Sequence, residues 1–270
     1  MGLVSQIDRI VADLGHRGPL LVAFSGGVDS GLVAALSYRA LGEDALAVTA
    51  AAETMAGREL DQARLLAAEI GIAHEVVTYS ELDNAEFVAN PSFRCYVCQG
   101  MRMDSMAELA HRRGYATVCD GTNSSDPGPN RPGLEAIAER GVYSPLLANG
   151  VDKTTARAMT RSLGLSVWDR PQNACLSSRI PHGQLVTLER LRRVEVAEEV
   201  LYGRGFRVVR VRNDRGRARV EVGPDEVERL SRLWPRISPE ILAVGFQEVA
   251  LEPGGYREGG ADLGASVAGD

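Results

Sequence analysis

An apolar run of strand length that ends in a glycine pair and leads into a helical pattern constrains the fold of this chain most. Residues 20–24 predict a buried strand, and residues 29–41 predict the helix. Glycines let backbone N–H groups come close to an anion, and the start of the helix adds unpaired N–H donors. Serine hydroxyls can donate to phosphate oxygens, and an aspartate can hold Mg²⁺ beside them. We therefore predict a nucleotide phosphate site, rather than an ordinary strand–helix turn, at Ser25, Gly26, Gly27, Asp29 and Ser30.

The first two-thirds of the chain alternate strand and helix signals. The predicted strands are 20–24, 45–50, 74–79 and 115–119, and the predicted helices are 3–14, 29–41, 57–70, 100–113 and 153–163. This alternation is typical of an α/β fold with a doubly wound, mostly parallel sheet. Ligands bind such sheets beyond the carboxyl ends of the strands. We therefore expect further nucleotide contacts at two other strand ends, from Thr49 at one and from Gly121 and Thr122 at the other.

A stretch rich in breaker residues, 170–183, separates this part from a smaller one. The second part is predicted as helix 187–202, strands 206–212 and 217–222, helix 224–234 and strand 245–251. We predict an α/β domain over residues 1–182 and a small α+β domain over residues 183–252. Residues 253–270 are rich in glycine and poor in apolar side chains, so we expect a disordered tail there.

Charge and hydropathy exclude two classes of protein. The net charge of −6 argues against a protein that coats nucleic acid. No apolar run approaches the ~20 residues that span a bilayer. Residues 1–10 predict an amphipathic helix rather than a signal peptide. We expect a cytoplasmic protein that acts on a small molecule, with neither a membrane nor a nucleic acid as partner.

Cysteines in this sequence favour ligand or nucleophile roles over disulfides, which are rare in a reducing cytosol. Cys175 lies in a polar loop next to Arg179, and its thiolate would be a nucleophile or a metal ligand, although an exposed cysteine without a role is the alternative. Cys95 and Cys98 form a C-x-x-C pair, which suits a redox dithiol, half of a zinc site, part of an iron–sulfur site or a pair that binds nothing. Cys119 is interpreted as a core residue.

An arginine-rich hairpin in the second part predicts an anion site. Alternation places Arg210 and Arg212 on one face of a strand, and Arg219 and Glu221 on one face of the next. Guanidinium groups bind phosphate through paired N–H donors. We expect a phosphate of the substrate at Arg210, Arg212 and Arg219, with a solvated hairpin as the alternative.

Four segments together make the sequence similar to a known family. Residues 25–30 resemble the SGGxDS loop of the N-type ATP pyrophosphatases, in which ATP is cleaved between its α and β phosphates. With residues 94–98, 120–123 and 174–183, the sequence resembles the LarE family of ATP-dependent sulfur transferases. The resemblance implies nickel-pincer nucleotide cofactor biosynthesis. There, a carboxylate of a pyridinium dicarboxylate mononucleotide is adenylated and becomes a thiocarboxylate, with release of AMP and pyrophosphate.

The resemblance also implies roles for single residues. Cys175 would receive the adenylated substrate, and Lys153, at a helix start, would meet the phosphates of ATP. Magnesium would sit at Asp29. Glu199 could be a metal ligand, but a solvated helix face is the better interpretation. The expected cofactors are ATP and Mg²⁺, and the expected partners are the mononucleotide, a sulfur donor and further copies of the chain.

Two sulfur sources stay open. In single-cysteine members of the family the cysteine gives up its own sulfur, but Cys95 and Cys98 resemble the three-cysteine branch. We favour a [4Fe-4S] cluster on Cys95, Cys98 and Cys175 as the carrier of a labile sulfide. Two other functions remain as alternatives: a tRNA-thiolating or amidating ATP pyrophosphatase, and an ATP-binding sensor without catalysis.

Overall fold

The computed structural model describes residues 2–126, 128 and 131–257. Contacts divide the chain into two compact units. Unit 1 comprises residues 1–81 and 93–173, and unit 2 comprises residues 82–92 and 174–270. The division therefore falls at 173/174, ahead of the 182/183 boundary drawn from the sequence, and a short segment near residue 90 belongs with the second unit. Of the expected tail, residues 258–270 lie outside the described part of the chain.

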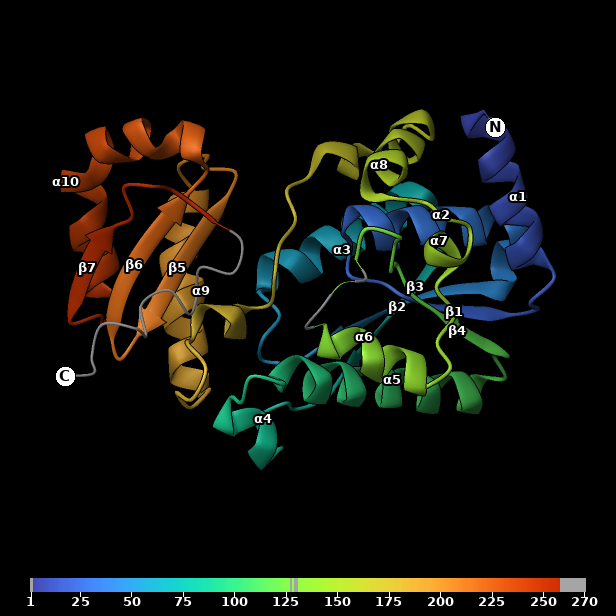
Figure 1. The fold of residues 1–270 in the computed structure, drawn as a ribbon, viewed down its shortest axis with the longest axis horizontal. Helices are drawn as coiled ribbons and strands as arrows, with labels where there is room; N and C mark the ends of the chain where they lie inside the picture. The colour runs from blue at the N-terminus through green and yellow to red at the C-terminus, as the bar shows by residue number, and fades with distance from the viewer. Residues whose placement is uncertain (1, 127, 129–130, 258–270) are drawn as a thin grey trace. The chain divides into compact units, whose positions relative to one another are not determined.

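Unit 1 contains a parallel sheet with the strand order β3-β2-β1-β4 (Figure 1). Its strands are β1 (Leu20–Ala23), β2 (Ala45–Ala51), β3 (Ala73–Thr78) and β4 (Thr117–Cys119). Its α-helices are α1 (Leu3–Gly15), α2 (Val28–Leu41), α3 (Gly57–Ile70), α5 (Arg94–Arg113), α6 (Pro132–Glu139), α7 (Pro145–Ala148) and α8 (Lys153–Ser162). Two 3₁₀ turns, η1 (Gly42–Asp44) and η2 (Ser166–Asp169), complete it.

Helices cover both faces of this sheet. Leu20 and Val22 of β1 pack in one core with residues of α1, α2, α3 and α8, and Leu21 packs in another with residues of α5 and α6. Figure 1 shows α5 and α6 on the side of the sheet opposite α1, α2 and α8. Successive side chains of a strand point to opposite faces, so one apolar strand serves both cores. The predicted α/β fold with a doubly wound parallel sheet is confirmed.

Unit 2 is built on a mixed sheet with the order β5-β6-β7, in which β5 and β6 are antiparallel and β6 and β7 parallel. Its strands are β5 (Val209–Asp214), β6 (Arg217–Val222) and β7 (Glu248–Leu251). Its α-helices are α4 (Ala85–Ala89), α9 (Leu188–Tyr202) and α10 (Val227–Ala243), and its 3₁₀ turns are η3 (Leu176–Arg179) and η4 (Pro224–Glu226). The smaller sheet confirms the expected second α+β unit.

One face of this second sheet is apolar and the other is charged. Valines of β5 and β6 pack against α9 and α10, with Leu201 and Ile237 in the same core. The paired residues Arg210↔Glu221 and Arg212↔Arg219 lie on the other face, as the alternation in the sequence predicts. Helices α9 and α10 therefore cover the apolar side of this sheet.

Among the predicted helices, α10 and α5 differ most from their expected bounds, strands β5 and β7 each begin three residues later than expected, and helices α4, α6 and α7 were not predicted. Helix α10 runs on through Pro235 and Pro239, whereas a helix that ends at residue 234 was predicted. A proline inside a helix removes one hydrogen bond, but this helix buries Ile237 and Ile241 beyond the first proline, which offsets that loss. Helix α5 begins at Arg94 rather than at residue 100, so the C-x-x-C pair lies inside the helix and not before it.

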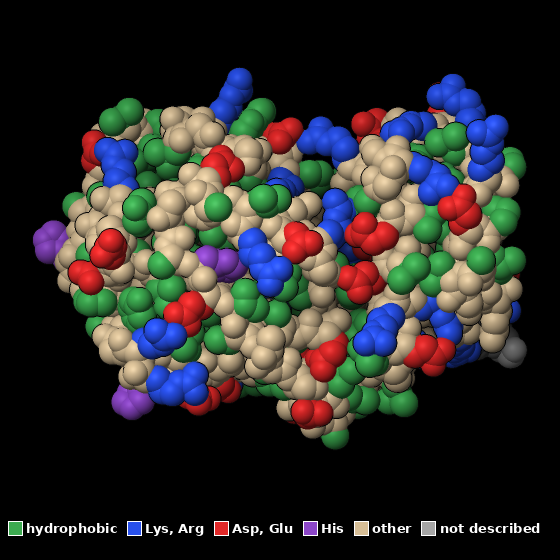
Figure 2. Space-filling model, turned by 180° about the vertical axis from the view of Figure 1, so that it is seen from behind, with side chains coloured by type: hydrophobic (Ala, Val, Ile, Leu, Met, Phe, Trp, Pro, Cys, Tyr) green, Lys and Arg blue, Asp and Glu red, His purple; other side chains and the backbone are tan. Residues whose placement is uncertain are grey.

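The surface carries charges of both signs. On the face drawn in Figure 2, Lys and Arg side chains are interspersed with Asp and Glu side chains. Within the part of the chain that the structure describes, no helix combines the length and the apolarity required to cross a bilayer.

Candidate active site

Residues 25–30 form a tight loop between β1 and α2. The backbone N–H of Ser25 donates to Ser30 Oγ at 3.2 Å, and the two serine hydroxyl oxygens lie 3.0 Å apart. Gly26 has a φ of 72°, and a Cβ at this position would lie 2.7 Å from the Cα of Ala63. The loop therefore requires glycine at position 26. It leaves the first turn of α2 with the unpaired N–H groups of a helix start, which attract an anion.

Asp29, in the first turn of α2, is paired with Lys153, the first residue of α8. Lys153 Nζ binds Asp29 Oδ2, whereas Asp29 Oδ1 is buried and has no hydrogen-bond partner among the described residues. Burial raises the pKa of Asp29, and the ammonium group of Lys153 opposes this effect. A buried carboxylate oxygen without a partner is costly in a finished structure. The residues thus fit a Mg²⁺ ion, which this oxygen would bind.

The end of β4 packs directly on this loop. A Cβ on Gly121 would lie 2.7 Å from the backbone N of Ser30, so the two segments approach more closely than any other residue would allow. Thr122 donates to Asp120, and Ser144 donates to Asp120 Oδ1 at 2.6 Å. Burial raises the pKa of Asp120, and the two hydroxyl donors counteract it. Gly121 is therefore brought against residues 25–30, which we call the phosphate loop after its predicted ligand, while the Thr122 hydroxyl donates a hydrogen bond within the protein.

Thr49, which was predicted to contact the nucleotide, is buried in the protein. Its side chain is 1% exposed, and its hydroxyl donates to the carbonyl oxygen of Phe24 at 2.8 Å. The same hydroxyl lies 2.8 Å from His74 Nε2. Burial lowers the pKa of His74, and the positive charge of Arg64 adds to this effect.

The sequence analysis did not identify a contact of Arg170 to the loop, and it did not use the fact that the chain has a single lysine. Arg170 donates from NH1 to the carbonyl oxygen of Gly26 at 2.8 Å, and nothing in its local sequence marks it out. Lys153 is the only lysine of the chain. Every other basic side chain except histidine is an arginine. The single side-chain ammonium group of the sequence is therefore the one that pairs with Asp29.

Cys95 and Cys98 lie in the first two turns of α5, and their surroundings differ. Cys95 is exposed, whereas Cys98 is buried and donates from Sγ to Glu81 Oε1 at 2.9 Å. Glu81 is fully buried and also accepts hydrogen bonds from Thr54 Oγ1 at 2.5 Å and from Tyr79 at 3.0 Å. Its carboxylate is therefore the centre of a buried polar network, which the sequence did not reveal.

Cys95 and Cys98 offer thiol sulfurs, which are the kind of donor atom that an iron–sulfur site needs. Side chains at positions i and i+3 of a helix are neighbours, so the two thiols share one side of α5. Thiolates are the usual ligands of iron–sulfur clusters. Within the described residues, no group of three or more His, Cys, Asp or Glu side chains is arranged to hold a metal ion. The third candidate ligand, Cys175, belongs to unit 2.

Cys175 precedes η3 and is half-buried. Its Sγ lies 3.1 Å from Ser177 Oγ, and its carbonyl oxygen accepts a hydrogen bond from the N–H of Ser178 at 3.0 Å. Arg179, at the end of the same turn, is fully buried and pairs with Glu198 of α9 at 2.8 Å. The thiol thus sits on a short loop that is fixed by buried contacts.

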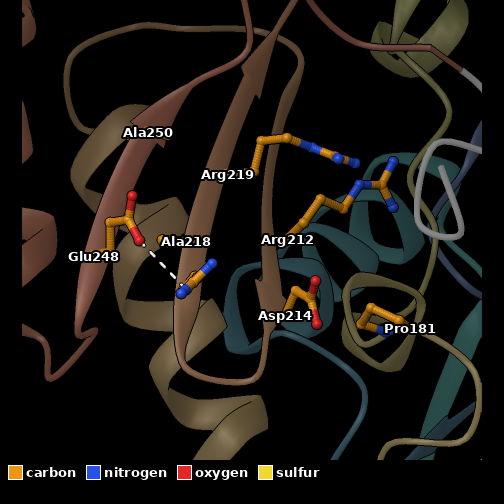
Figure 3. Close-up of a pocket in the computed structure, with 8 residues that line it drawn as sticks. Pro181, Arg212, Asp214, Ala218, Arg219, Glu248 and Ala250 are labelled. Carbon is orange, nitrogen blue, oxygen red and sulfur yellow. Dashed lines mark ion pairs between the residues drawn. The ribbon is translucent and has the colours of Figure 1, made fainter. Parts of the chain in front are cut away.

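The charged face of the second sheet holds a cavity of about 180 Å³. Figure 3 shows the side chains of Arg212 and Arg219 extending into the same space. The cavity is lined by Pro181, Arg212, Asp214, Arg217, Ala218, Arg219, Glu248 and Ala250. Glu221 pairs with Arg212 at 3.0 Å and with Arg219 at 3.2 Å. The arginines are therefore held in place by acidic partners before any ligand binds.

Arg210 is buried and is not among the residues that line the cavity. It is 3% exposed, donates to the carbonyl oxygen of Val209 at 2.7 Å, and stacks over the ring of Tyr256 at 5.0 Å. Burial lowers the pKa of Arg210, and repulsion from Arg179 adds to the effect. The structure thus brings together Arg212 and Arg219 at the cavity. Glu199 is exposed on α9, in agreement with a solvated face, whereas its neighbour Glu198 is buried.

Comparison with known proteins adds an independent line of evidence. The family model for asparagine synthase matches residues 5–107, which include the phosphate loop. An uncharacterized protein of Synechocystis is 39% identical over 95% of this chain and 97% of its own length. The pyridinium-3,5-bisthiocarboxylic acid mononucleotide synthase of Lactiplantibacillus plantarum is 34% identical over 95% of this chain and 94% of its own. The tRNA-specific 2-thiouridylase MnmA of Caulobacter vibrioides is 27% identical, over 68% of this chain and 58% of its own.

Proposed function

We propose a function on the premise that the chain belongs to the LarE family, since it matches the Lactiplantibacillus plantarum synthase over nearly its whole length. The chain is accordingly an ATP-dependent sulfurtransferase of cofactor biosynthesis. Its substrate in our proposal is a pyridinium dicarboxylate mononucleotide, and its product is the corresponding thiocarboxylate. The observation that carries this proposal is the near-complete match to a relative whose name states that chemistry.

The first half of the reaction is adenylation. A substrate carboxylate attacks the α-phosphorus of ATP. The bond from this phosphorus to the oxygen that bridges the α and β phosphates breaks, and pyrophosphate leaves with the electron pair. Residues 25–30 and the first turn of α2 would bind the phosphates, and Lys153 would neutralise charge on the departing pyrophosphate. Asp29 would hold Mg²⁺, whose charge stabilises the phosphate oxygens.

The second half is sulfur delivery at Cys175. In one route, its thiolate attacks the acyl carbon and AMP leaves, which forms a thioester. A base then takes the proton from Cα of Cys175 and the bond between Sγ and Cβ breaks. The sulfur leaves on the substrate with the electron pair of that bond, and dehydroalanine remains. In the other, which we favour, Cys95, Cys98 and Cys175 would hold a [4Fe-4S] cluster, a group that can supply a labile sulfide.

The phosphate of the mononucleotide would bind in the cavity of unit 2. Arg212 and Arg219 point into it and offer paired N–H donors, and Arg210 adds positive charge beneath them. Bound phosphate would share these arginines with Glu221, which keeps their side chains oriented.

A single-turnover experiment tests the function. Protein purified without oxygen is mixed with ATP and the mononucleotide, and AMP, pyrophosphate and thiocarboxylate are measured together with iron and acid-labile sulfide. We expect AMP only when the carboxylate substrate is present. Iron-free protein in which Cys175 becomes dehydroalanine during turnover would refute the cluster and support the sacrificial route. AMP formation without any carboxylate would contradict the proposed function.

One alternative function keeps a specific observation in its favour. The similarity to tRNA 2-thiouridylases extends over more than half of the chain. In a second version of the single-turnover experiment, transcribed tRNA is therefore added in place of the mononucleotide. Thiouridine in the recovered tRNA, with pyrophosphate release that depends on tRNA, would replace our proposal with that activity. Light scattering of the purified protein tests the further expectation of a homo-oligomer.

A further inference from the structure

Arg179 is fully buried and uses its whole guanidinium group. Its Nε and NH2 donate to the two carboxylate oxygens of Glu198 at 2.8 and 3.0 Å. Its NH1 donates to the carbonyl oxygens of Ala174 at 2.5 Å and of Cys175 at 3.0 Å. One side chain thus binds both the backbone of the Cys175 loop and Glu198 of α9.

Glu198 continues the connection to the sheet. The same oxygen that receives Arg179 Nε accepts the backbone N–H of Val211 at 3.0 Å. Val211 stands on β5 between Arg210 and Arg212, the arginines proposed to meet the substrate phosphate. A second connection runs parallel to the first, because Arg212 NH1 donates to the carbonyl oxygen of Ser178 at 3.0 Å. The loop of Cys175 is therefore joined at two points to the strand that carries the arginines.

Stability alone is a weak reason for such a pair. Two charges lose their hydration on burial, and apolar side chains of similar size often stabilise a core as well or better. Burial by itself lowers the pKa of Arg179, but the Glu198 carboxylate outweighs this effect and the pKa is raised. Unlike apolar packing, the pair fixes the orientation of the groups that it joins. The planar fork of arginine fixes the angle as well as the distance between the groups it joins.

We propose that Arg179 and Glu198 are positioning residues that hold the Cys175 thiol at a set distance from the arginines of β5. This inference rests on the proposed function, in which the phosphate end of the substrate binds at those arginines. The pair then acts as a fixed spacer between the phosphate site and the sulfur. The activated carboxyl of a mononucleotide that fits this spacing meets the thiol, and a longer or shorter anionic acid binds but reacts slowly.

Two conservative variants test the spacer, and a third serves as control. Glu198→Gln keeps the size and one acceptor oxygen but loses the charge, and Arg179→Lys keeps the charge but loses the fork. Glu240→Gln breaks an exposed pair between α10 and Arg204, which follows the end of α9. Hydrogen exchange is followed by mass spectrometry over peptides that cover residues 174–180, with peptides of β1 and α10 as a check on global folding. Alkylation of Cys175 by iodoacetamide is followed in the same digests.

In both test variants we expect exchange over residues 174–180 to accelerate about tenfold or more, while the check peptides stay unchanged. We also expect the alkylation rate of Cys175 to change. The kcat for thiocarboxylate formation should fall by about a hundredfold, as a displacement near 1 Å produces, while KM for the mononucleotide stays within about twofold. Glu240→Gln should resemble the wild type in every measurement.

The results separate the two proposals. Unchanged exchange over residues 174–180 in Glu198→Gln would overturn the spacer, whatever the activity. So would faster exchange with an undiminished kcat, or an Arg179→Lys variant as active as the wild type. If the wild type forms no thiocarboxylate, the proposed function fails, while the exchange and alkylation data still report whether the pair fixes the loop.

Discussion

Lys153 binds one carboxylate oxygen of Asp29, and the other oxygen of that carboxylate is buried without a hydrogen-bond partner among the described residues. The two residues are 124 positions apart in the chain. The lysine binds one oxygen of the carboxylate, and the other oxygen is the one that would bind Mg²⁺ in our proposal. This pair is the strongest structural support for the ATP site that we propose.

Lys153→Ala should reduce AMP and pyrophosphate formation by about a hundredfold or more, because a preorganised charge on the leaving group is lost. Since Lys153 is the only lysine, an amine-reactive reagent can modify it and the N-terminal amine alone. Mass spectrometry of the modified peptide should show that ATP with Mg²⁺ protects Lys153. Arg161→Ala, at the far end of α8, is the control. Labelling of Lys153 at the same rate with and without ATP would contradict this placement.

Gly121→Ala should weaken ATP binding and destabilise the protein. The added Cβ would lie 2.7 Å from the backbone N of Ser30, which cannot rotate away. Overpacking of this kind costs about 1–3 kcal/mol. Urea denaturation gives the loss of stability, and equilibrium dialysis gives the ATP affinity. Gly15→Ala, where nothing lies within 4 Å, should leave both unchanged. A Gly121→Ala protein with normal ATP affinity would show that the close approach is not needed.

Arg212→Gln and Arg219→Gln should each raise KM for the mononucleotide by about tenfold or more, because a hydrogen bond to a charged group contributes about 1.5–3 kcal/mol. KM for ATP should not change. Arg232→Gln, at an exposed pair with Glu228, is the matched control. Steady-state kinetics at saturating ATP provide the measurement. Equal KM values for the mononucleotide in variants and wild type would remove the substrate phosphate from this cavity.

Cys175→Ser should abolish thiocarboxylate formation by either route while adenylation of the substrate continues, because a hydroxyl is a far weaker nucleophile and a poorer iron ligand than a thiolate. Rapid-quench measurement of AMP and product in one turnover separates the two steps. Cys119→Ser serves as a cysteine control because Cys119 is fully buried and burial raises its pKa, which keeps the thiol protonated. Thiocarboxylate formed by Cys175→Ser at the wild-type yield would exclude Cys175 as the site of sulfur delivery.

Stability should fall as the pH drops below about 6.5. Burial lowers the pKa of His74 in the folded state below its ordinary value of 6.5, so the unfolded chain binds a proton first. The ring contacts Thr49 and Phe24 and feels the charge of Arg64, and none of these can compensate a positive charge. His74→Gln should therefore show a flatter pH dependence of the unfolding free energy between pH values of about 5 and about 7. His111→Gln, at an exposed position, should retain the slope of the wild type.

Local sequence predicted much of this protein. The apolar run before Ser25, the glycine pair and the helix after it were sufficient to predict the strand, the loop and the helix start that the structure contains. The alternation of Arg and Val in β5 likewise predicted which side chains share a face. These features depend on neighbours in the chain, whose side chains follow a fixed period in a strand or a helix.

The sequence by itself determined the α/β fold, the phosphate loop and the charged face of the small sheet, because each of these is a periodic or local pattern. Only the tertiary structure decided that Glu198, and not Glu199, turns inward to Arg179, since one residue along a helix changes the facing direction by about 100°. It also decided that Asp29 meets Lys153 and that Cys98 meets Glu81. Such pairs join distant segments, and their geometry follows from how the strands and helices pack rather than from any pattern along the chain.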